Sequence, residues 1–373
     1  MRLAVVTHNV VKGDGQGRAN YEIVRHALRN GVTVHLIADR IDEDLPASGA
    51  RWIPNQPKTL RQVNLIKVWE FARRANQTLR KIAQDIDLIH GYGYCLDVPH
   101  QVNTSQFVHS AWIQSPAHTA RQHRNLYGLY QWTYSALNSK WERQAYNNAQ
   151  TVVAASTTVR QELSGLGIPD AKLRVIWNGA DLTEFHPGAV DRAQLGLPEG
   201  VPLALFGGDL RTPRKNLDSV LAAFAQAPSV HLAVVGKTEN SPFPALAERL
   251  GIADRVHFLG FRRDIADVMR GVDFFVFPSR YEAFALVIAE ATASGLPIIT
   301  SKSTGGAEIV TSESGIVVDD PNDVNALAQA IRGLASDRER RRTMGEQAWQ
   351  RAQTNTWEDV AGAYLNLYRE FRK

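Results

Sequence analysis

Two glutamates flank the start of a predicted helix in the C-terminal half of the chain. Glu282 lies in the loop after an apolar strand that ends at Phe277, and eight residues later Glu290 lies inside the helix. That helix is predicted to begin near Ala285 and to be capped at its far end by Gly295. The unpaired N–H groups and the positive dipole end of a helix start favour an anion such as a diphosphate, and a carboxylate accepts hydrogen bonds from adjacent hydroxyls. The arrangement suits a molecule built from a sugar, a diphosphate and a ribose, although two solvated glutamates would show the same spacing.

Alternating strands and helices are predicted to position these residues. In the first part of the chain, strands are predicted at 2–7, 32–37, 88–90 and 106–109, with a glycine-rich loop at 13–17 and a helix at 21–30 after the first strand. The alternation restarts with strands at 203–206, 231–235, 256–259, 274–277, 297–300 and 315–318, and with a helix at 217–226. Such alternation predicts parallel sheets that are covered on both faces. Two runs in series predict two similar α/β domains.

The length of the chain also favours more than one domain. It has 373 residues, against ~150 for a typical domain. A predicted strand at 174–177 is followed by Pro and Gly near residue 187, so the predicted domains are 1–187 and 188–354. The remaining segment, 355–373, carries aromatic residues at helical spacing and is predicted to be a helix that packs back on the N-terminal domain.

Composition excludes several classes of protein. Hydrophobic residues make up 44% and charged residues 21% of the chain, which is typical of a folded globular protein. The single cysteine, Cys95, excludes a disulfide framework and a cysteine-based zinc site. A net charge of +4 is too small to indicate a nucleic-acid partner. No apolar run approaches ~18 residues, and the N-terminal run is too short for a signal peptide, so a cytoplasmic location is expected.

Basic residues are concentrated in the first half of the chain. Residues 1–187 hold 21 basic and 15 acidic residues, a net charge of +6. Seven basic residues and one acid lie between Lys58 and Gln84, where a helix with one apolar and one cationic face is predicted. Aromatic and basic residues also alternate around 126–134. Basic amphipathic helices lie on anionic membranes, which suggests a peripheral membrane surface and a lipid-linked partner. The alternative is that the apolar residues face the core and the bases face solvent.

The Glu-x7-Glu element does not stand alone. Together with its Pro-Ser flank and its Gly-Leu-Pro-Ile-Ile exit, it resembles the signature of the retaining glycosyltransferases of family 4. Val175–Asp181 with Phe185-His-Pro187 is similar to that family's interdomain junction, Arg214-Lys-Asn-Leu217 to its basic phosphate motif, and Thr304-Gly-Gly-Ala-Glu308 to its late glycine loop. The matches run from about residue 2 to residue 330.

The resemblance implies a fold and an activity. The expected fold is GT-B, an α/β architecture of two Rossmann-like domains whose parallel sheets face each other across an interdomain cleft. The N-terminal domain would bind the acceptor and the C-terminal domain the nucleotide sugar. The implied activity is retaining, metal-independent transfer of a sugar from a nucleoside-diphosphate sugar to an acceptor hydroxyl, in the synthesis of a cell-surface polysaccharide, lipopolysaccharide or glycolipid. A sugar or lipid-linked glycan is the expected acceptor, and no cofactor is expected.

The resemblance also implies roles for particular residues. Glu282, His109 and Lys215 would be the catalytic residues: Glu282 would bind a donor-sugar hydroxyl, His109 would bind the sugar and shape the acceptor site, and Lys215 would neutralise the leaving phosphate. Donor binding would involve Glu290 at the ribose, and Arg211, Arg214, Phe284, Ala285, Leu286, Gly15 and Gly17. His109 is predicted to end a strand, at the edge where open α/β sheets bind ligands.

Three positions depart from the family pattern. Ala283 and Ala285 stand where many members have glycine, so methyl groups would crowd the sugar pocket. Asp209 stands where many have arginine, so Arg211 or Arg214 would supply the second cation.

The sequence Asp42-Glu-Asp44 has the form of a metal-binding D-x-D motif, but it lies in a polar loop far from the other elements, and no metal site is predicted.

Three other functions share parts of this pattern. Gly13, Gly15 and Gly17 follow the first strand and Asp39 ends the second, as in an NAD(P)-dependent Rossmann dehydrogenase, although the loop lacks the G-x-G-x-x-G spacing. A nucleotide-sugar epimerase shares the domain type but not the Glu-x7-Glu element. A non-catalytic nucleotide-sugar binder would carry the same residues as a transferase and would differ from it only in turnover.

Overall fold

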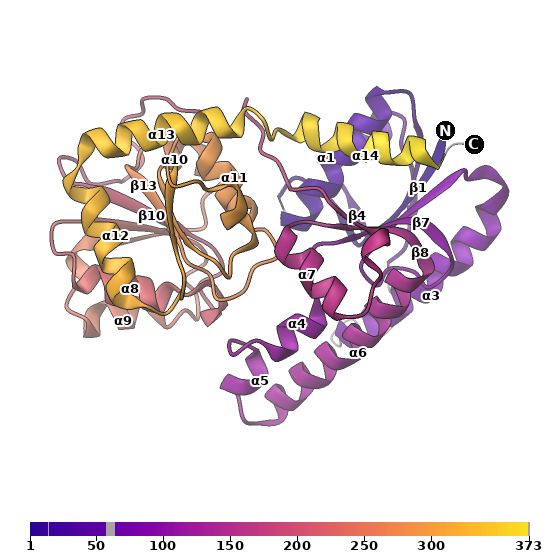
Figure 1. Cartoon of the computed structure of the whole chain (residues 1–373), viewed down its shortest axis with the longest axis horizontal. Coiled ribbons are helices and arrows are strands. Elements are labelled where there is room, and N and C mark those ends of the chain that lie inside the picture. Colours follow the sequence, from indigo (N-terminus) through magenta and orange to yellow (C-terminus); the bar gives the residue numbers. More distant parts are fainter. Residues whose placement is uncertain (14, 57–63, 372–373) are drawn as a thin grey trace. The chain divides into compact units, whose positions relative to one another are not determined.

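The chain folds into two units. The computed structural model describes residues 1–13, 15–56 and 64–371. One unit comprises Met1–Asn178 and Trp357–Lys373, and the other comprises Gly179–Thr356 (Figure 1). The first stretch therefore ends nine residues before the predicted boundary at 187. The intervening residues belong with the second unit because Ala180 forms a β-bridge with Thr356 and the Phe185 side chain is buried.

A seven-stranded parallel sheet forms the centre of the first unit. Its strands are β1 (Arg2–Val6), β3 (Thr33–Ala38), β5 (Arg51–Pro54), β6 (Leu88–Tyr92), β7 (His100–Ser105), β8 (Ala149–Ala154) and β9 (Leu173–Val175). Their order is β5-β3-β1-β6-β7-β8-β9, so the strand order reverses between β1 and β6. The short strands β2 (Asn9–Val10) and β4 (Arg40–Ile41) pair separately. In open parallel sheets, the crevice at such a reversal is where ligands bind.

Helices cover this sheet. They are α1 (Gly15–Arg29), α2 (Asp44–Ala47), α3 (Asn64–Ile82), α4 (His109–Gln114), α5 (Thr119–Gln122), α6 (Leu126–Asn148), α7 (Thr157–Gly165) and α14 (Trp357–Glu370), with 3-10 turns η1 (Ala83–Asp85) and η2 (Asp170–Lys172). The last helix, α14, returns to the first unit and packs beside α1 (Figure 1). Its buried residues include Trp357, Tyr364 and Tyr368, the aromatic stripe seen in the sequence.

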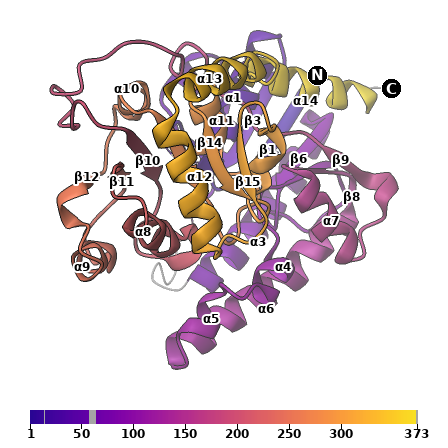
Figure 2. The same ribbon diagram turned by 60° about the vertical axis from the view of Figure 1, so that its left-hand side comes forward.

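The second unit repeats the design with six parallel strands. These are β10 (Leu203–Gly207), β11 (His231–Val235), β12 (Val256–Gly260), β13 (Phe274–Phe277), β14 (Ile298–Ser301) and β15 (Gly315–Val318), in the order β12-β11-β10-β13-β14-β15. Its helices are α8 (Leu217–Ala225), α9 (Phe243–Arg249), α10 (Ile265–Arg270), α11 (Leu286–Ala293), α12 (Val324–Ser336) and α13 (Arg338–Ala352), with turns η3 (Pro213–Lys215), η4 (Ala253–Arg255) and η5 (Gly305–Ile309). Helices α8 and α12 lie side by side (Figure 2).

One predicted strand in the first unit is wrong. Residues 106–109 are not a strand: β7 runs over His100–Ser105, and His109 is the first residue of α4. The strand was missed because its sequence, His-Gln-Val-Asn-Thr-Ser, is mostly polar, whereas strands covered on both faces usually read as apolar runs. The polar side chains are nevertheless buried and bonded within the unit, as Thr104 is to His90 and Tyr364.

Other boundaries also differ from the predictions. Helix α1 begins at Gly15 rather than near residue 21, so Gly15 and Gly17 lie in its first turn instead of in a loop. Strands β5 and β8 were not predicted, and β9 covers Leu173–Val175 rather than 174–177. Asp14 of the glycine-rich loop, and Lys58 and Arg61 of the basic segment, lie outside the described residues.

Buried hydrogen bonds attach α14 to the first sheet. The Tyr368 hydroxyl lies 2.7 Å from His90 Nδ1, and His90 Nε2 lies 2.8 Å from the Thr104 hydroxyl. Thr104 in turn lies 3.0 Å from the Tyr364 hydroxyl. Burial lowers the pKa of His90 to about 3 and that of the nearby His100 to about 4. Both imidazoles are therefore neutral in the folded chain at neutral pH.

We expect the thermal stability of the protein to fall when the pH drops from 7 to 5. Below pH 6.5 the unfolded chain takes up protons at His90 and His100 and the folded chain does not, so the free energy of unfolding decreases as the pH falls towards 4. At pH 5 the loss is about 2 kcal/mol for each histidine. The melting temperature measured across this range checks the effect. His100→Asn should reduce the slope and substitution of the exposed His123 by Asn should leave it unchanged; equal slopes in all three proteins would contradict the assignment.

Candidate functional site

The loop between β13 and α11 places Glu282 beyond the carboxyl end of the second sheet. Its strand β13 is the neighbour of β10, at the point where the strand order of the sheet reverses. Two backbone hydrogen bonds hold the glutamate: its N–H donates to the carbonyl of Ser303 (3.2 Å), and its carbonyl accepts from Gly305 (2.9 Å). The segment from 303 to 305 thereby fixes Glu282 at the position where parallel sheets bind ligands.

Two cations share the carboxylate of Glu282. Arg214 Nη1 lies 3.0 Å from Glu282 Oε1, and Lys215 Nζ forms an ion pair with the same oxygen. The Lys215 ammonium also lies over the ring of Phe277, 5.4 Å from its centroid. Burial lowers the pKa of Lys215, and the Glu282 carboxylate opposes that shift. The structure thus brings Glu282, Lys215 and Arg214 into one part-buried cluster.

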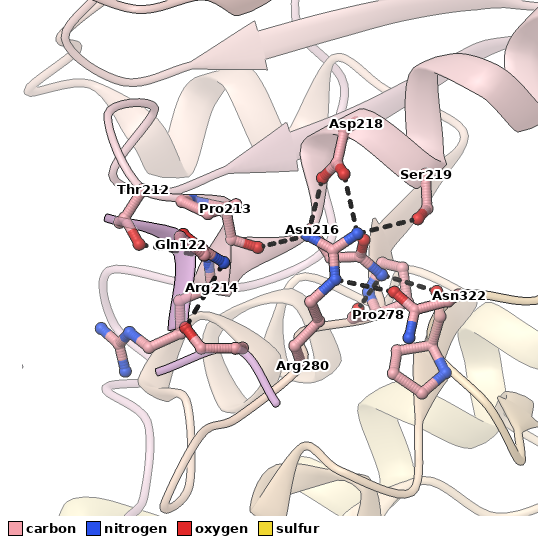
Figure 3. A network of polar contacts seen from close by, with 12 residues as sticks. Gln122, Thr212, Pro213, Arg214, Asn216, Asp218, Ser219, Pro278, Arg280 and Asn322 are labelled. Carbon is pink, nitrogen blue, oxygen red and sulfur yellow. Dashed lines mark hydrogen bonds and ion pairs between the residues drawn. The ribbon is translucent and has the colours of Figure 1, made fainter. Parts of the chain in front are cut away.

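A third cation, Arg280, is hydrogen-bonded to the turn that carries Arg214 and Lys215 (Figure 3). Its guanidinium donates two hydrogen bonds to the carboxylate of Asp218, at 2.9 and 2.7 Å, and one to the carbonyl of Pro213 at 2.6 Å. Its backbone N–H donates to the carbonyl of Arg214 (2.9 Å). The sequence patterns did not single out Arg280, although it lies inside the motif, directly after its Pro-Ser flank.

The turn itself depends on Asn216. This residue is fully buried and adopts a left-handed conformation (φ 68°), which asparagine tolerates better than most residues. Its side-chain amide donates to the carbonyls of Pro278 (2.8 Å) and Pro321 (2.5 Å). Asn216 therefore links the cationic turn to the loops after β13 and β15.

Helix α11 starts from an unusual backbone conformation. Ala285, directly before its first residue Leu286, has φ 74°, a region that strains residues with a side chain. The neighbouring Phe284 is buried, and its carbonyl accepts a hydrogen bond of 2.5 Å from Gly306. Glycine is required at 306 because a Cβ there would lie 2.3 Å from that carbonyl oxygen. Glu290 is half-buried in the second turn of α11.

Arg211, the other arginine proposed to supply the second cation, has a different partner. The guanidinium of Arg211 is bonded to Asp209 through Nε (2.9 Å) and Nη2 (3.1 Å) and is largely exposed. Asp209, the acid that stands where many family members have arginine, is therefore paired with Arg211. Of the two arginines proposed to supply the second cation, it is Arg214 that lies against Glu282.

The first unit has a pocket of its own, of about 180 Å³, at the carboxyl ends of β1, β6 and β7. His109 lines it from the start of α4, not from a strand end as predicted. Glu142 of α6 accepts hydrogen bonds of 2.8 Å from both His109 N and His109 Nδ1. Glu142 was also missed by the sequence patterns. It is the single acid between Asp97 and Glu162, and nothing else in the sequence of this helix indicates a functional residue.

The glycines predicted to bind the donor lie at the same end of the first unit. Gly15 and Gly17 belong to the first turn of α1, and Gln16 between them lines the pocket. Their role as donor ligands stays a prediction. Two acids of the D-x-D sequence are bonded to Lys12 of a separate loop: Asp42 accepts from the N–H of Lys12 (2.9 Å), and Asp44 pairs with the Lys12 ammonium (3.1 Å).

Two absences apply to the described residues alone. In residues 1–13, 15–56 and 64–371 no three His, Cys, Asp or Glu side chains gather as metal ligands. Over the same ranges, none of the helices has both the length and the apolar character needed to cross a membrane. The basic helix α3 buries its apolar face, including Phe71 and Leu79, within the first unit.

Two protein-family profiles match consecutive parts of the chain. Residues 13–184 match "Glycosyltransferase Family 4" and residues 189–351 match "Glycosyl transferases group 1". The D-inositol 3-phosphate glycosyltransferase of Mycobacterium marinum is 33% identical over 248 residues, which cover 62% of this chain and 53% of that protein. The chain spans about half the length of the curated relatives it matches.

Solved structures share the fold. Sucrose-phosphate synthase from Thermosynechococcus elongatus superposes with a TM-score of 0.83 at 24% identity, over 99% of this chain and 98% of that one. Anabaena HepE, solved in complex with UDP and glucose, gives a TM-score of 0.71 at 22% identity, over 99% of both chains. The predicted α/β fold with two Rossmann-like domains, each built on a parallel sheet, is confirmed.

We expect Ala285→Gly to stabilise the second unit. Relief of a left-handed alanine is worth ~1–2 kcal/mol, and the greater freedom of glycine in the unfolded chain takes back ~0.4–1 kcal/mol. The net gain of about 0–1.6 kcal/mol corresponds to a rise in melting temperature of at most roughly 3–6 °C. Ala283→Gly, two residues away and without a positive φ, is the matched control and should lower the melting temperature. A lower melting temperature for Ala285→Gly would show that the alanine is not strained.

Proposed function

Because this chain belongs to glycosyltransferase family 4, we propose that it transfers a sugar, with retention of configuration, from a nucleoside-diphosphate sugar to an acceptor hydroxyl. The observation that carries the proposal is the cluster of Glu282, Arg214 and Lys215 beside the start of α11. A diphosphate is bound by cations and N–H donors, and the hydroxyls of a sugar are bound by a carboxylate. Cations, a helix start and a carboxylate lie together beyond the carboxyl ends of the strands in the second unit.

The Glu282 carboxylate lies at a position where an anion would bind. It already pairs with both cations that a diphosphate would need. When the diphosphate binds, its oxygens take over Arg214 and Lys215, and the carboxylate turns to the hydroxyls of the donor sugar. Glu290 is proposed to accept hydrogen bonds from the ribose, and Phe284, Ala285 and Leu286 to offer backbone groups to the diphosphate.

Departure of the nucleoside diphosphate is the step that these cations assist. Negative charge grows on the leaving phosphate as the bond to the sugar breaks, and a fixed ammonium and guanidinium stabilise it. The leaving phosphate is proposed to take the proton of the attacking hydroxyl on the same face of the sugar. No metal and no cofactor belongs to the proposal, because Lys215 and Arg214 supply the positive charge. The UDP and glucose of the Anabaena structure support a nucleoside-diphosphate donor.

The acceptor is proposed to be a sugar or a lipid-linked glycan of a cell-surface polysaccharide, lipopolysaccharide or glycolipid, reached from a peripheral position on the inner face of the membrane. An exposed surface of the first unit supports this. The first turns of α6 expose Leu126 (85%), Leu129 (61%) and Trp132 (52%). Residues 98–141 contain no Asp or Glu, while Arg121 and Arg124 lie exposed just before α6. Apolar side chains among uncompensated bases match an anionic lipid interface.

Glycine at one position shapes this surface. A Cβ on Gly128 would lie 1.7 Å from the carbonyl oxygen of His123, so only glycine lets α6 turn back so closely on α5. The side chains of its neighbours Tyr127 and Leu129 consequently point away from the unit, and both are more than half exposed. The tip formed by residues 121–132 thus combines a fixed backbone with an apolar exterior.

Nucleotide binding and turnover test the enzymatic proposal. Lys215→Met removes a charge-assisted contact to the diphosphate and should weaken binding of the preferred nucleoside diphosphate roughly 10- to 100-fold. Glu282→Gln removes the competing carboxylate charge and should tighten that binding, while lowering sugar transfer at least 100-fold. Calorimetric titration with UDP, GDP and ADP, followed by transfer from the corresponding nucleotide sugars, measures both effects.

The exposed Glu313 provides the control, because Glu313→Gln changes the same charge away from the cluster. It should alter neither binding nor transfer. Weaker nucleotide binding in Glu282→Gln would contradict the proposed exchange of anions. Binding of NAD without any nucleoside diphosphate would overturn the transferase proposal in favour of a dehydrogenase, and nucleotide-sugar binding without turnover on any acceptor would favour a non-catalytic binder.

Vesicle binding tests the proposed membrane surface. The double variant Leu126→Ser and Leu129→Ser removes two side chains that would each contribute ~1.5–3 kcal/mol on insertion, so partition onto phosphatidylglycerol vesicles should fall at least tenfold. Phe261→Ser is the matched control, since Phe261 of the second unit is exposed to a similar degree (65%). Unchanged sedimentation of the double variant with the vesicles, or equal binding to neutral phosphatidylcholine, would remove this surface from the proposal.

A further inference from the structure

The pocket of the first unit is lined mainly by uncharged polar and aromatic groups. Its lining consists of hydroxyl, amide and aromatic groups from the carboxyl ends of β1, β6 and β7 and from α1 and α6, together with His8, His109 and Glu142. Within the described part of the chain, no lysine or arginine belongs to this lining. The volume of about 180 Å³ is well below the ~300–1,000 Å³ of pockets for drug-sized ligands, which suits a single sugar ring.

Among the described residues of the lining, the one carboxylate is that of Glu142. Glu142 is 2% exposed, and its carboxylate is fixed by two hydrogen bonds from His109. Loss of solvent around His8, whose ring packs against Phe71, lowers the pKa of its imidazole to about 4, so it carries no charge at neutral pH. A ligand entering the pocket therefore meets a buried carboxylate with no opposing lysine or arginine in the described lining.

Two polar atoms of the lining have no partner. Asn20 donates from Nδ2 to the Thr7 hydroxyl and to the carbonyl of Asn9, both at 2.9 Å, but its Oδ1 is buried and unpaired in the described structure. The Tyr92 hydroxyl is likewise buried without a partner among the described residues. An unpaired buried polar atom costs ~1–3 kcal/mol, so such atoms indicate a missing partner such as a ligand hydroxyl.

We propose that this pocket binds the accepting sugar as an uncharged polyol ring, and that Glu142 discriminates against acceptors that carry a phosphate on that ring. The inference rests on the proposed function, and it departs from the relative named for inositol 3-phosphate. Amide and hydroxyl groups satisfy ring hydroxyls, and Asn20 Oδ1 accepts from one of them. A phosphate within about 5 Å of a buried carboxylate is repelled strongly enough to reduce acceptor use at least 100-fold.

Matched acceptor pairs test the substrate class. Transfer by the full-length protein from its nucleotide sugar is measured to myo-inositol and to the methyl glycosides of glucose, galactose and mannose, each against its own phosphate ester. We expect at least one neutral member to exceed its phosphate at least 100-fold in kcat/KM. A phosphate ester that equals or exceeds its neutral partner overturns the inference, and so does a failure of every neutral ring to accept sugar. Nucleotide binding, measured separately, shows whether the proposed function itself survives that failure.

Glu142→Gln identifies the source of the discrimination. The substitution removes the charge and keeps the shape, so the ratio of neutral to phosphorylated acceptor should fall at least tenfold, with phosphate esters gaining in absolute kcat/KM. A residue that only positions His109 would lower both members of a pair equally and leave the ratio unchanged, and that result overturns the assignment. Glu43→Gln, at an exposed glutamate of the same unit, is the control and should preserve the ratio.

Discussion

The bidentate contact between Arg280 and Asp218 is the interaction on which the site in the second unit depends. Arg214 and Lys215 sit on a short 3-10 turn, and so short a turn cannot hold two long cationic side chains in one geometry by itself. Arg280, in the loop after β13, donates hydrogen bonds to the Pro213 carbonyl of this turn and to the Asp218 carboxylate at the start of α8. Because the same loop continues to Glu282, a single segment fixes the carboxylate and the turn that carries its two cations.

The two units use similar sheets for opposite electrostatic purposes. Each sheet reverses its strand order at its centre, and each has polar residues beyond the carboxyl ends of the strands. In the second unit those residues are two cations balanced by one carboxylate, which suits an anionic ligand. In the first unit they are neutral groups around the buried carboxylate of Glu142, which suits an uncharged one. The proposed division between a charged donor and a neutral acceptor rests on this difference in charge.

Sequence patterns predicted the parts of the fold whose sequences are apolar and local. The strands of the second sheet are mostly apolar runs, and the sequence located all six of them. Strand β7 was missed because its stability comes from buried hydrogen bonds, such as Thr104 to Tyr364 across 260 residues of chain, which no local pattern reveals. The roles of Arg280 and Glu142 were missed for the same reason: their partners lie 62 and 33 residues away. The predicted role of Glu282 remains untested, but its position beside Lys215 could not be read from spacing.

The left-handed Ala285 connects the strain in the backbone to the choice of donor. Glycine would adopt this conformation without the local strain of ~1–2 kcal/mol that the alanine side chain brings. The conformation is maintained by its neighbours: Gly306 donates to the Phe284 carbonyl, and Ile288 donates to the Ala285 carbonyl at 3.0 Å. Strain that the surroundings maintain is commonly found at ligand sites. Since Ala285 directly precedes the first turn of α11, its methyl group is predicted to narrow the space beside the proposed diphosphate.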